Sequence, residues 1–367
     1  MKNIKKYLTS LVFTAVLAAS VYAQDAGRTA LPFLKMDMGA RYYGMAGAAT
    51  ALADDVTGMA FYNPAALGMV ESFQLAGTTS EAQLDMKYHH GALAFPVGFL
   101  SIFGNNPLNI AFSGYVFDKG DTDDVYSRKI GDDWSFSFGI GEHIGTTAWE
   151  AFGTSSDLEH YIGVTGKYLR SELAKPREGN VKGDAFAFDA GYTAVLDRHF
   201  GVGVAIKNIG TDIKYIEEKD PLPATLSAGL FFVPVDVEGI HWTLSGDFIS
   251  YLKEKENRVR IGTEMYLFDM LAVRGGVKLM EEIKEEWTLG FGLKLFGFEI
   301  DAGTILNPQL NDDKVYQISV AYKFPVSKKD AYSEKEKERN EYKEYKKKQQ
   351  DTAFERAQRN ANPLIYQ

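Results

Sequence analysis

Hydrophobic and polar residues alternate with a period of two along most of the chain from Ser72 onward. From Trp287 to Leu295 every second residue is apolar, and the residues between them are Thr288, Gly290, Gly292 and Lys294. The same split recurs from Leu271 to Leu279 and from Tyr316 to Phe324. Successive side chains of a strand point to opposite faces, so the pattern predicts strands with one apolar and one more polar face.

The alternation predicts about fourteen strands, centred near residues 76, 92, 113, 137, 165, 189, 205, 228, 245, 262, 275, 291, 301 and 319. A soluble β-sandwich also alternates, but several of these strands approach the 9 to 11 residues that cross a bilayer at a tilt. A closed bacterial barrel requires an even number of strands. We therefore expect an all-β fold, a transmembrane antiparallel β-barrel over residues 71–325.

Charged residues in the middle of the predicted strands favour the barrel over the sandwich. They lie on the less apolar face and are Arg260, Glu264, Arg274, Lys278, Lys294 and Lys323. Charges are costly in a dry sandwich core, whereas the lumen of a barrel is polar. We expect all six to face a wet lumen.

The connections alternate in length. Tight turns are expected at Asp197–His199, Phe268–Asp269 and Phe296–Gly297, and long polar loops at Asp118–Asp133, Ser171–Gly183 and Gly210–Pro221. With both termini in the periplasm, the short turns fall on that side and the long loops on the cell surface, as is typical of such barrels. The segment 142–157 is long where a short turn is expected. It predicts either a miscounted strand pair or an inserted helix.

The two ends of the sequence differ from the barrel. Lys2, Lys5 and Lys6 precede an apolar run over residues 8–19, and Val21-Tyr22-Ala23 suits signal peptidase, so residues 1–23 are predicted to be a signal peptide. A transmembrane anchor is the alternative, but it needs about 20 apolar residues. Residues 326–367 hold eleven basic and eight acidic residues. They predict a helical or disordered periplasmic tail, with docking to peptidoglycan or a secretion partner as the alternative.

The sequence offers little catalytic chemistry. It has no cysteine, no Gly-x-Ser-x-Gly or His-Glu-x-x-His motif and no phosphate-binding loop. The six histidines are scattered, and the acidic run 121–124 lacks the spacing of an EF-hand. We expect no enzyme, no catalytic residue, no metal site and no cofactor, with an outer-membrane hydrolase as a remote alternative.

A stretch rich in small residues precedes the first predicted strand. Its landmarks are Gly39, Ala40, Arg41, Gly44, Met45, Gly47, Ala51, Ala53, Asp54, Asp55, Asn63, Pro64, Ala65 and Leu67. They resemble the N-terminal signature of the PorV/PorQ group, which is related to the fatty-acid transporter FadL, whose plug carries a similar Ala-Asp-Asp and Asn-Pro-Ala pattern. The resemblance implies a 14-stranded barrel with residues 24–70 folded into the lumen as a hatch. A soluble N-terminal lobe is the alternative.

The hatch motif consists of Gly39, Arg41, Gly44, Gly47, Asp54, Asp55, Asn63 and Pro64. Its glycines allow close backbone packing, and the run 48–53 is predicted to be helix-prone. We expect Arg41 to bridge to a lumenal carboxylate, and Asp54 and Asp55 to cap the following turn or pair with lumenal arginines. Asn63-Pro64 is expected to start a tight turn before the first strand.

The resemblance implies the outer membrane of a Gram-negative (diderm) bacterium. Expected partners are outer-membrane lipid, lipopolysaccharide and the barrel assembly machinery, but no nucleic acid. The signature lies nearer to PorV/PorQ and favours docking of exported cargo proteins in type IX-like secretion. The alternative is FadL-like uptake of a hydrophobic small molecule such as a fatty acid, along aromatics such as Phe231, Tyr266, Tyr126 and Tyr215. A continuous apolar channel favours uptake, and a polar, fully plugged lumen favours docking.

Overall fold

The computed structural model describes residues 28–81, 86–103, 106–120, 131–151, 154–173, 181–280, 285–307 and 315–325. The predicted signal peptide, the predicted tail at 326–367, the acidic run 121–124 and Tyr126 lie outside these ranges. Within them, no helix has the length and apolar character that crossing a membrane requires.

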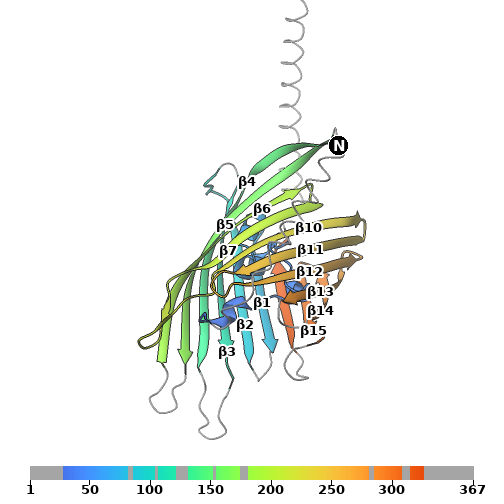
Figure 1. The fold of residues 1–367 in the computed structure, drawn as a ribbon. Coiled ribbons are helices and arrows are strands. Elements are labelled where there is room, and N and C mark those ends of the chain that lie inside the picture. Colours follow the sequence, from blue (N-terminus) through green and yellow to red (C-terminus); the bar gives the residue numbers. More distant parts are fainter. Residues whose placement is uncertain are drawn as a thin grey trace, which may run out of the picture. The chain divides into compact units, whose positions relative to one another are not determined.

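The described residues form a closed antiparallel barrel in which β1 pairs with β16 (Figure 1). Its strands are β1 (Gln74–Glu81), β2 (Lys87–Val97), β3 (Leu108–Asp118), β4 (Asp132–Ala151), β5 (Thr154–Leu173), β6 (Val181–Leu196), β7 (Phe200–Gly210), β10 (Thr225–Val237), β11 (Ile240–Tyr251), β12 (Glu256–Leu267), β13 (Leu271–Met280), β14 (Glu286–Leu295), β15 (Phe298–Ile305) and β16 (Tyr316–Lys323). The short β8 (Ile213–Lys214) and β9 (Lys219–Asp220) pair with each other between β7 and β10. The predicted fourteen-stranded barrel is confirmed, and every predicted centre falls within a barrel strand.

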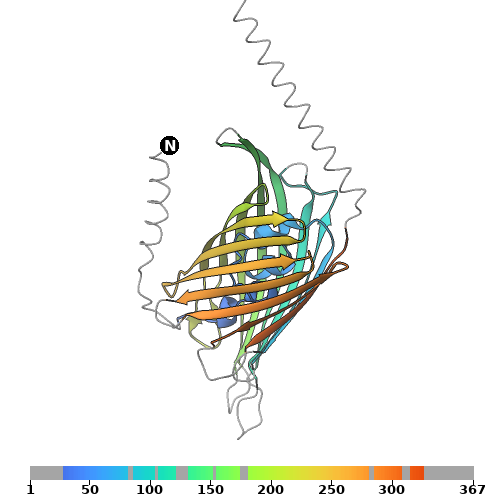
Figure 2. The ribbon, with the colours of Figure 1, turned by 90° about the vertical axis from the view of Figure 1, so that its right-hand side faces the viewer.

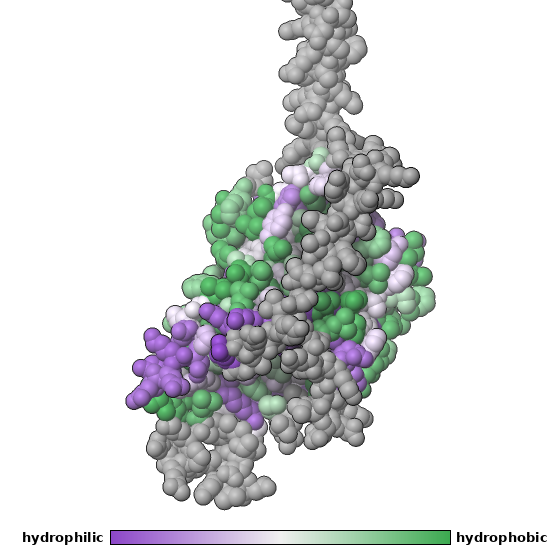
Figure 3. Space-filling view, in the orientation of Figure 1, coloured by the Kyte–Doolittle hydropathy of each residue, from purple (hydrophilic) through white to green (hydrophobic). Residues whose placement is uncertain are grey.

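The outer surface of the barrel is apolar. Outward-facing side chains such as Phe138, Phe188 and Leu230 are 47 %, 64 % and 50 % exposed, while their sequence neighbours point inward and are mostly buried. Hydrophobic residues cover much of the visible strand surface in Figure 3. A closed barrel leaves no free sheet edge, and an apolar exterior suits contact with lipid, so this is a membrane-spanning barrel.

The barrel has two different rims. We call the rim where β1 begins and β16 ends the terminal rim, and the opposite one the loop rim. At the terminal rim, left-handed backbone at Asp197, Phe268 and Phe296 closes three tight turns, whereas the connection between β2 and β3 spans residues 98–107. The expected long connections lie at the loop rim.

The segment 142–157 is neither an inserted helix nor a miscounted strand pair, so both expectations for it were wrong. Instead, β4 and β5 remain paired over their whole length, with one irregularity between His143 and Gly145. Neither β3 nor β6 follows them to the tip, so the hairpin projects past the terminal rim as a two-stranded ribbon (Figure 1). The projecting part, residues 148–157, carries no apolar alternation, so the sequence pattern did not reveal it.

Residues 28–73, the N-terminal segment, lie within the ring of strands (Figures 1 and 2). The segment contains two 3₁₀-helices, η1 (Pro32–Lys35) and η2 (Pro64–Met69), and two short α-helices, α2 (Ala40–Tyr43) and α3 (Val56–Phe61). Helix α2 contacts β14 to β16, whereas η2 contacts β3 to β6. The segment therefore touches opposite walls of the lumen.

The run 48–53 forms a turn, so the expected helix is absent there. The backbone N–H groups of Ala49 and Thr50 donate to Oδ2 of Asp247 on β11, at 2.9 and 2.8 Å. Ser245 Oγ on the same strand donates to the Ala48 carbonyl oxygen at 2.7 Å. Ala53 N donates to the Ala49 carbonyl oxygen at 2.9 Å, so the run closes a single turn, and Asp247 satisfies the backbone N–H groups at its start.

Candidate functional site

One carboxylate of the N-terminal segment lies between an arginine and a lysine side chain of the wall. Asp37 Oδ1 is 2.6 Å from Arg260 Nη1 on β12, and its Oδ2 is 3.0 Å from Lys278 Nζ on β13. Burial alone would raise the pKa of Asp37, but the two positive charges lower it from 3.8 to about 2. Gly47, at φ 71°, packs so closely that an added Cβ would lie 2.5 Å from Arg260 Nη1.

A second ionic chain runs from the segment into the wall. Arg41 binds Asp54 at 2.6 Å and makes two contacts of 3.0 Å with Glu264 on β12. Glu264 also binds Arg274 Nε at 2.6 Å, and Arg274 reaches Asp301 at 2.7 Å. Arg41 thus meets a lumenal carboxylate, whereas Asp54 pairs within its own segment and not with a wall arginine.

Ion pairs bury the charged side chains of β12 and β13, whereas two lysines of β14 and β16 remain partly open to solvent. Arg260, Glu264, Arg274 and Lys278 are all at most 7 % exposed, which corrects the expectation of a wet lumen at these positions. Lys294 and Lys323 both reach Glu299, at 2.8 and 3.3 Å, and are more open. Pairing rather than water compensates the buried charges on this wall.

On the opposite wall, glycines let the two backbones touch. An added Cβ on Gly163 of β5 would lie 2.1 Å from the Pro64 carbonyl oxygen, and one on Gly191 of β6 would lie 1.8 Å from Asn63 Oδ1. Gly44 meets Gly290 of β14 in the same way, with 2.8 Å from its added Cβ to the Gly290 Cα. Glycines recurring on the polar face of predicted strands were a signal for these contacts that the sequence analysis did not use.

Capping groups fix the remaining motif residues. Asp55 caps α3 by accepting from Gly58 N at 2.7 Å. Asn63 caps η2 by accepting from Ala65 N at 3.0 Å, and its Nδ2 donates to Thr193 Oγ1 on β6 at 3.0 Å. Pro64 is the first residue of η2, and Gly39, at φ 91°, precedes α2. The motif thus acts as a set of helix starts and wall contacts.

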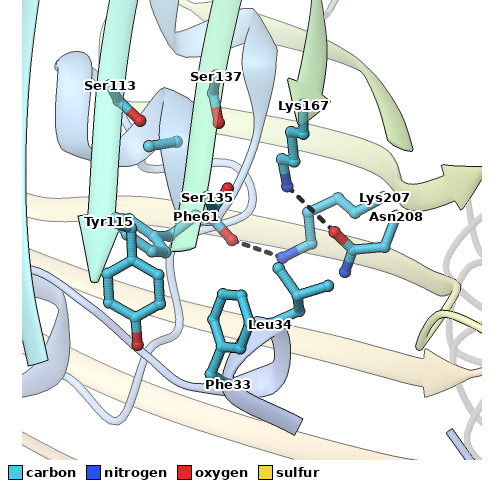
Figure 4. A pocket seen from close by; sticks show the side chains of 11 residues that line it. Phe33, Leu34, Phe61, Ser113, Tyr115, Ser135, Ser137, Lys167, Lys207 and Asn208 are labelled. Atoms are coloured by element: carbon cyan, nitrogen blue, oxygen red, sulfur yellow. Dashed lines mark hydrogen bonds between the residues drawn. The ribbon is translucent and has the colours of Figure 1, made fainter. Parts of the chain in front are cut away.

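A cavity lies between the segment and the β3–β7 wall (Figure 4). Its interior measures about 20 Å³, which is room for about one water molecule. The segment supplies Phe33, Leu34, Ala60 and Phe61, and the wall supplies Ser113, Tyr115, Ser135, Ser137, Lys167, Lys207 and Asn208. The lining therefore combines aromatic rings with hydroxyl groups and two lysines.

The two lysines of the cavity differ in their partners. Lys167 Nζ lies 2.5 Å from Asp189 Oδ2 and donates to Asn208 Oδ1 at 3.1 Å. Lys207 Nζ donates to the Phe61 carbonyl oxygen at 2.6 Å but makes no ion pair within the described part of the chain. Figure 4 shows both hydrogen bonds. The cavity wall thus holds one ammonium group without a counter-ion.

Further unpartnered polar groups surround Phe61. Its ring lies edge-on to His90 at 4.7 Å and to Tyr115 at 5.5 Å. Both ring nitrogens of His90 and the Tyr115 hydroxyl are buried and lack a hydrogen-bond partner among the described residues. Buried polar groups are normally satisfied, so such a cluster beside a cavity is a candidate binding site. Phe231, Tyr266 and Tyr215, expected to line an apolar path, do not line this cavity.

Within the described ranges, no group of three or more histidine, aspartate or glutamate side chains is arranged to hold a metal ion. The fold and the site together define a membrane-spanning β-barrel whose lumen is filled by its own N-terminal segment.

Comparison with known proteins gives a fold likeness only. No protein-family model matches the chain, and no curated protein matches it. Among solved structures, it is similar to the Ralstonia pickettii toluene transporter TbuX, at 12% identity and a TM-score of 0.47, over 78% of this chain and 98% of that chain. A Pseudomonas aeruginosa FadL homologue matches at 12% identity and 0.42, over 82% and 100%. The Escherichia coli outer membrane phospholipase A matches at 11% identity and 0.31, over 71% and 96%. These scores carry no conclusion about function.

Proposed function

We propose that the protein admits a small amphiphilic molecule, with an apolar body and one negative charge, across the outer membrane of a Gram-negative (diderm) bacterium, with both termini in the periplasm. The observation that carries this proposal is the cavity beside Phe61, in which Lys207 lacks an acidic partner. Lys207 is half-buried, and an ammonium partly removed from water without a counter-ion is costly, so an anionic ligand would offset that cost.

The cavity also supports the chemical class of the ligand. Asp189 neutralises Lys167, so the lining keeps a single uncompensated charge, that of Lys207. The cavity has room for about one water molecule as it stands, so the body of the molecule would reach the rings of Phe33 and Phe61 once the N-terminal segment moves away from the wall. A monoanion such as a carboxylate fits this combination better than a neutral hydrocarbon or a dianion.

The contact between Lys207 and the N-terminal segment supports a gating role for that segment. Lys207 Nζ holds the carbonyl oxygen of Phe61, the last residue of α3. A ligand anion at Lys207 competes for the same donor and weakens the hold on α3. The ion pairs of Asp37 and Arg41 keep the other side of the segment on the β12–β16 wall. The segment would then move on the cavity side while remaining tethered on the ionic side.

A second candidate function is docking of exported cargo proteins, as the PorV/PorQ resemblance implies. The filled, ion-paired wall from β12 to β16 favours it, because a plugged lumen suits a docking protein. Contacts with lipopolysaccharide and with the barrel assembly machinery belong to this proposal as well and remain predictions.

Binding of a fluorescent fatty acid to the purified barrel tests the first function. A saturable signal is expected, and Lys207→Met should weaken binding of the acid at least tenfold while binding of the alcohol of equal chain length changes little. Lys294→Met is the matched control, because Lys294 is a lumenal lysine outside the cavity. Absence of saturable binding to the unaltered protein would overturn uptake and leave docking as the better proposal.

A further inference from the structure

The turn between β2 and β3 presents large apolar side chains to the outside at the terminal rim. Phe99, Leu100, Ile102 and Phe103 are 86 %, 44 %, 56 % and 58 % exposed. They lie within five residues of chain, directly after β2 ends at Val97. A contiguous exposed apolar patch of this kind marks a surface that contacts a partner or a membrane.

A buried carboxylate fixes this turn. Glu142 of β4 is 1 % exposed, and its carboxylate accepts from Ser101 Oγ at 2.6 Å, Ile102 N at 2.8 Å and Phe103 N at 3.2 Å. Asn106 Nδ2 adds a hydrogen bond to the His143 carbonyl oxygen at 2.7 Å. The turn is thus held in one conformation although its side chains are exposed.

Glu142 lies on the outward face of β4. Phe136 and Phe138 point outward and are 53 % and 47 % exposed, and strand alternation places Ile140 and Glu142 on the same face. An outward carboxylate next to lipid is costly when it is bare. The backbone of the turn covers the Glu142 carboxylate. The outer surface at this point is then formed by the exposed side chains of Ile102 and Phe103.

The height of the neighbouring wall brings the turns of the terminal rim close to lipid. Strands β1, β15 and β16 have 8 residues each. At about 3.4 Å per residue and a tilt near 40°, such a strand rises roughly 20 Å, less than the ~25 Å apolar band of an outer-membrane barrel.

Two further turns of the terminal rim each carry an exposed phenylalanine. Phe296, between β14 and β15, is 87 % exposed, and Phe268, between β12 and β13, is 74 % exposed. In barrel order, the strands from β12 through β16 and β1 to β3 are contiguous, so these two turns and the Phe99 turn follow one half of the rim. Aromatic residues concentrate at membrane interfaces. A row of exposed phenylalanines along the short wall therefore favours contact of these turns with a bilayer.

We propose that residues 98–103 are embedded in the acyl-chain boundary of the membrane, where they extend the lipid-facing surface of β2, β3 and β4. The occupant of the patch is lipid, and Glu142 is the positioning residue of the turn. This inference needs only a membrane-spanning barrel and is independent of what crosses the lumen.

Spin labelling tests the proposal directly, because the chain contains no cysteine. Phe99→Cys, labelled and reconstituted in vesicles of phosphatidylethanolamine and phosphatidylglycerol, is compared with Phe138→Cys on the lipid-facing surface and Ala148→Cys on the exposed ribbon. The ratio of oxygen to nickel-chelate accessibility at 99 is expected to approach that at 138 and to exceed that at 148 several-fold. A ratio equal to that at 148 places the turn in water and overturns the proposal, leaving a protein partner as the occupant.

The role of Glu142 is tested in the same labelled background. Glu142→Ala removes the acceptor of three donors, so the label at 99 should become more mobile and its accessibility ratio should fall towards that at 148. Glu142→Gln keeps one acceptor oxygen and should retain part of the effect, and Glu159→Ala on β5 is the control. Heat-modifiable electrophoretic migration verifies that each variant is folded. An unchanged label in folded Glu142→Ala shows that another group positions the turn.

Discussion

Replacing Gly163 by alanine should displace the N-terminal segment from its contact with β5, which we call unseating, without opening the barrel. The added Cβ would lie 2.1 Å from the Pro64 carbonyl oxygen, where ordinary contacts begin at 3.4 Å, so η2 must move by about 1.3 Å. The obstacle is backbone and cannot rotate away. Overpacking of this kind costs about 1–3 kcal/mol, which raises the population of the unseated segment roughly 5- to 150-fold.

Limited trypsin digestion measures that population, since cleavage requires the segment to leave the wall and its rate follows the open fraction when reclosing is fast. Cleavage after Lys35 and Arg41, read by mass spectrometry, should accelerate by that factor in Gly163→Ala. Gly166→Ala on the same strand is the control, because the nearest atom to its added Cβ is Phe188 Cε1 at 3.7 Å. If folded Gly163→Ala is cleaved as slowly as the unaltered protein, the close contact does not seat the segment.

Three further predictions concern the ionic wall. Asp37→Asn leaves Arg260 buried without its ion-pair partner and Lys278 with only the longer contact to Glu286 at 3.5 Å, so it should weaken seating by about 3–5 kcal/mol in the same digestion assay; an unchanged rate would contradict the pairing. Because the pKa of Asp37 is lowered from 3.8 to about 2, its contribution of about 2 kcal/mol is complete above pH 4 and is lost as the pH falls towards 2. A spin label at Leu34→Cys should report this transition, and the transition should be smaller in Asp37→Asn. Arg274→Met should lower the thermal stability of the barrel far more than Lys294→Met, because Arg274 is 1 % exposed between two carboxylates; equal effects would refute this.

The barrel was predictable from the sequence because its signal is local. Lipid on one side and a polar lumen on the other impose the same period of two on every strand, so residues such as Trp287 and Phe291 identify their face without knowledge of any partner. The ribbon at 148–157 was missed because it projects past the terminal rim and carries no such alternation. The helix-prone run 48–53 forms only a turn, and its backbone is bound by Asp247, almost two hundred residues away in the chain.

The candidate cavity could not be predicted from the sequence for a related reason. Phe33, Tyr115 and Lys207 come from three distant parts of the chain, and only the closed barrel brings them together. The charges of the β12–β16 wall were placed on the correct face, but their partners Asp37 and Arg41 are not encoded in any strand pattern. Pattern reasoning gives the direction of a side chain, whereas pairing depends on the tertiary fold.

The position of the N-terminal segment inside a closed ring has a consequence for folding order. Its contacts reach from β1 to β16, and those with the later strands join residues far apart in the sequence. The seam between β1 and β16, where Gln74 meets Lys323, can form only when the last strand is present. Contacts of such long range form slowly. The segment precedes every strand in the chain, so we expect it to be in place when the seam closes and the barrel to be built around its plug.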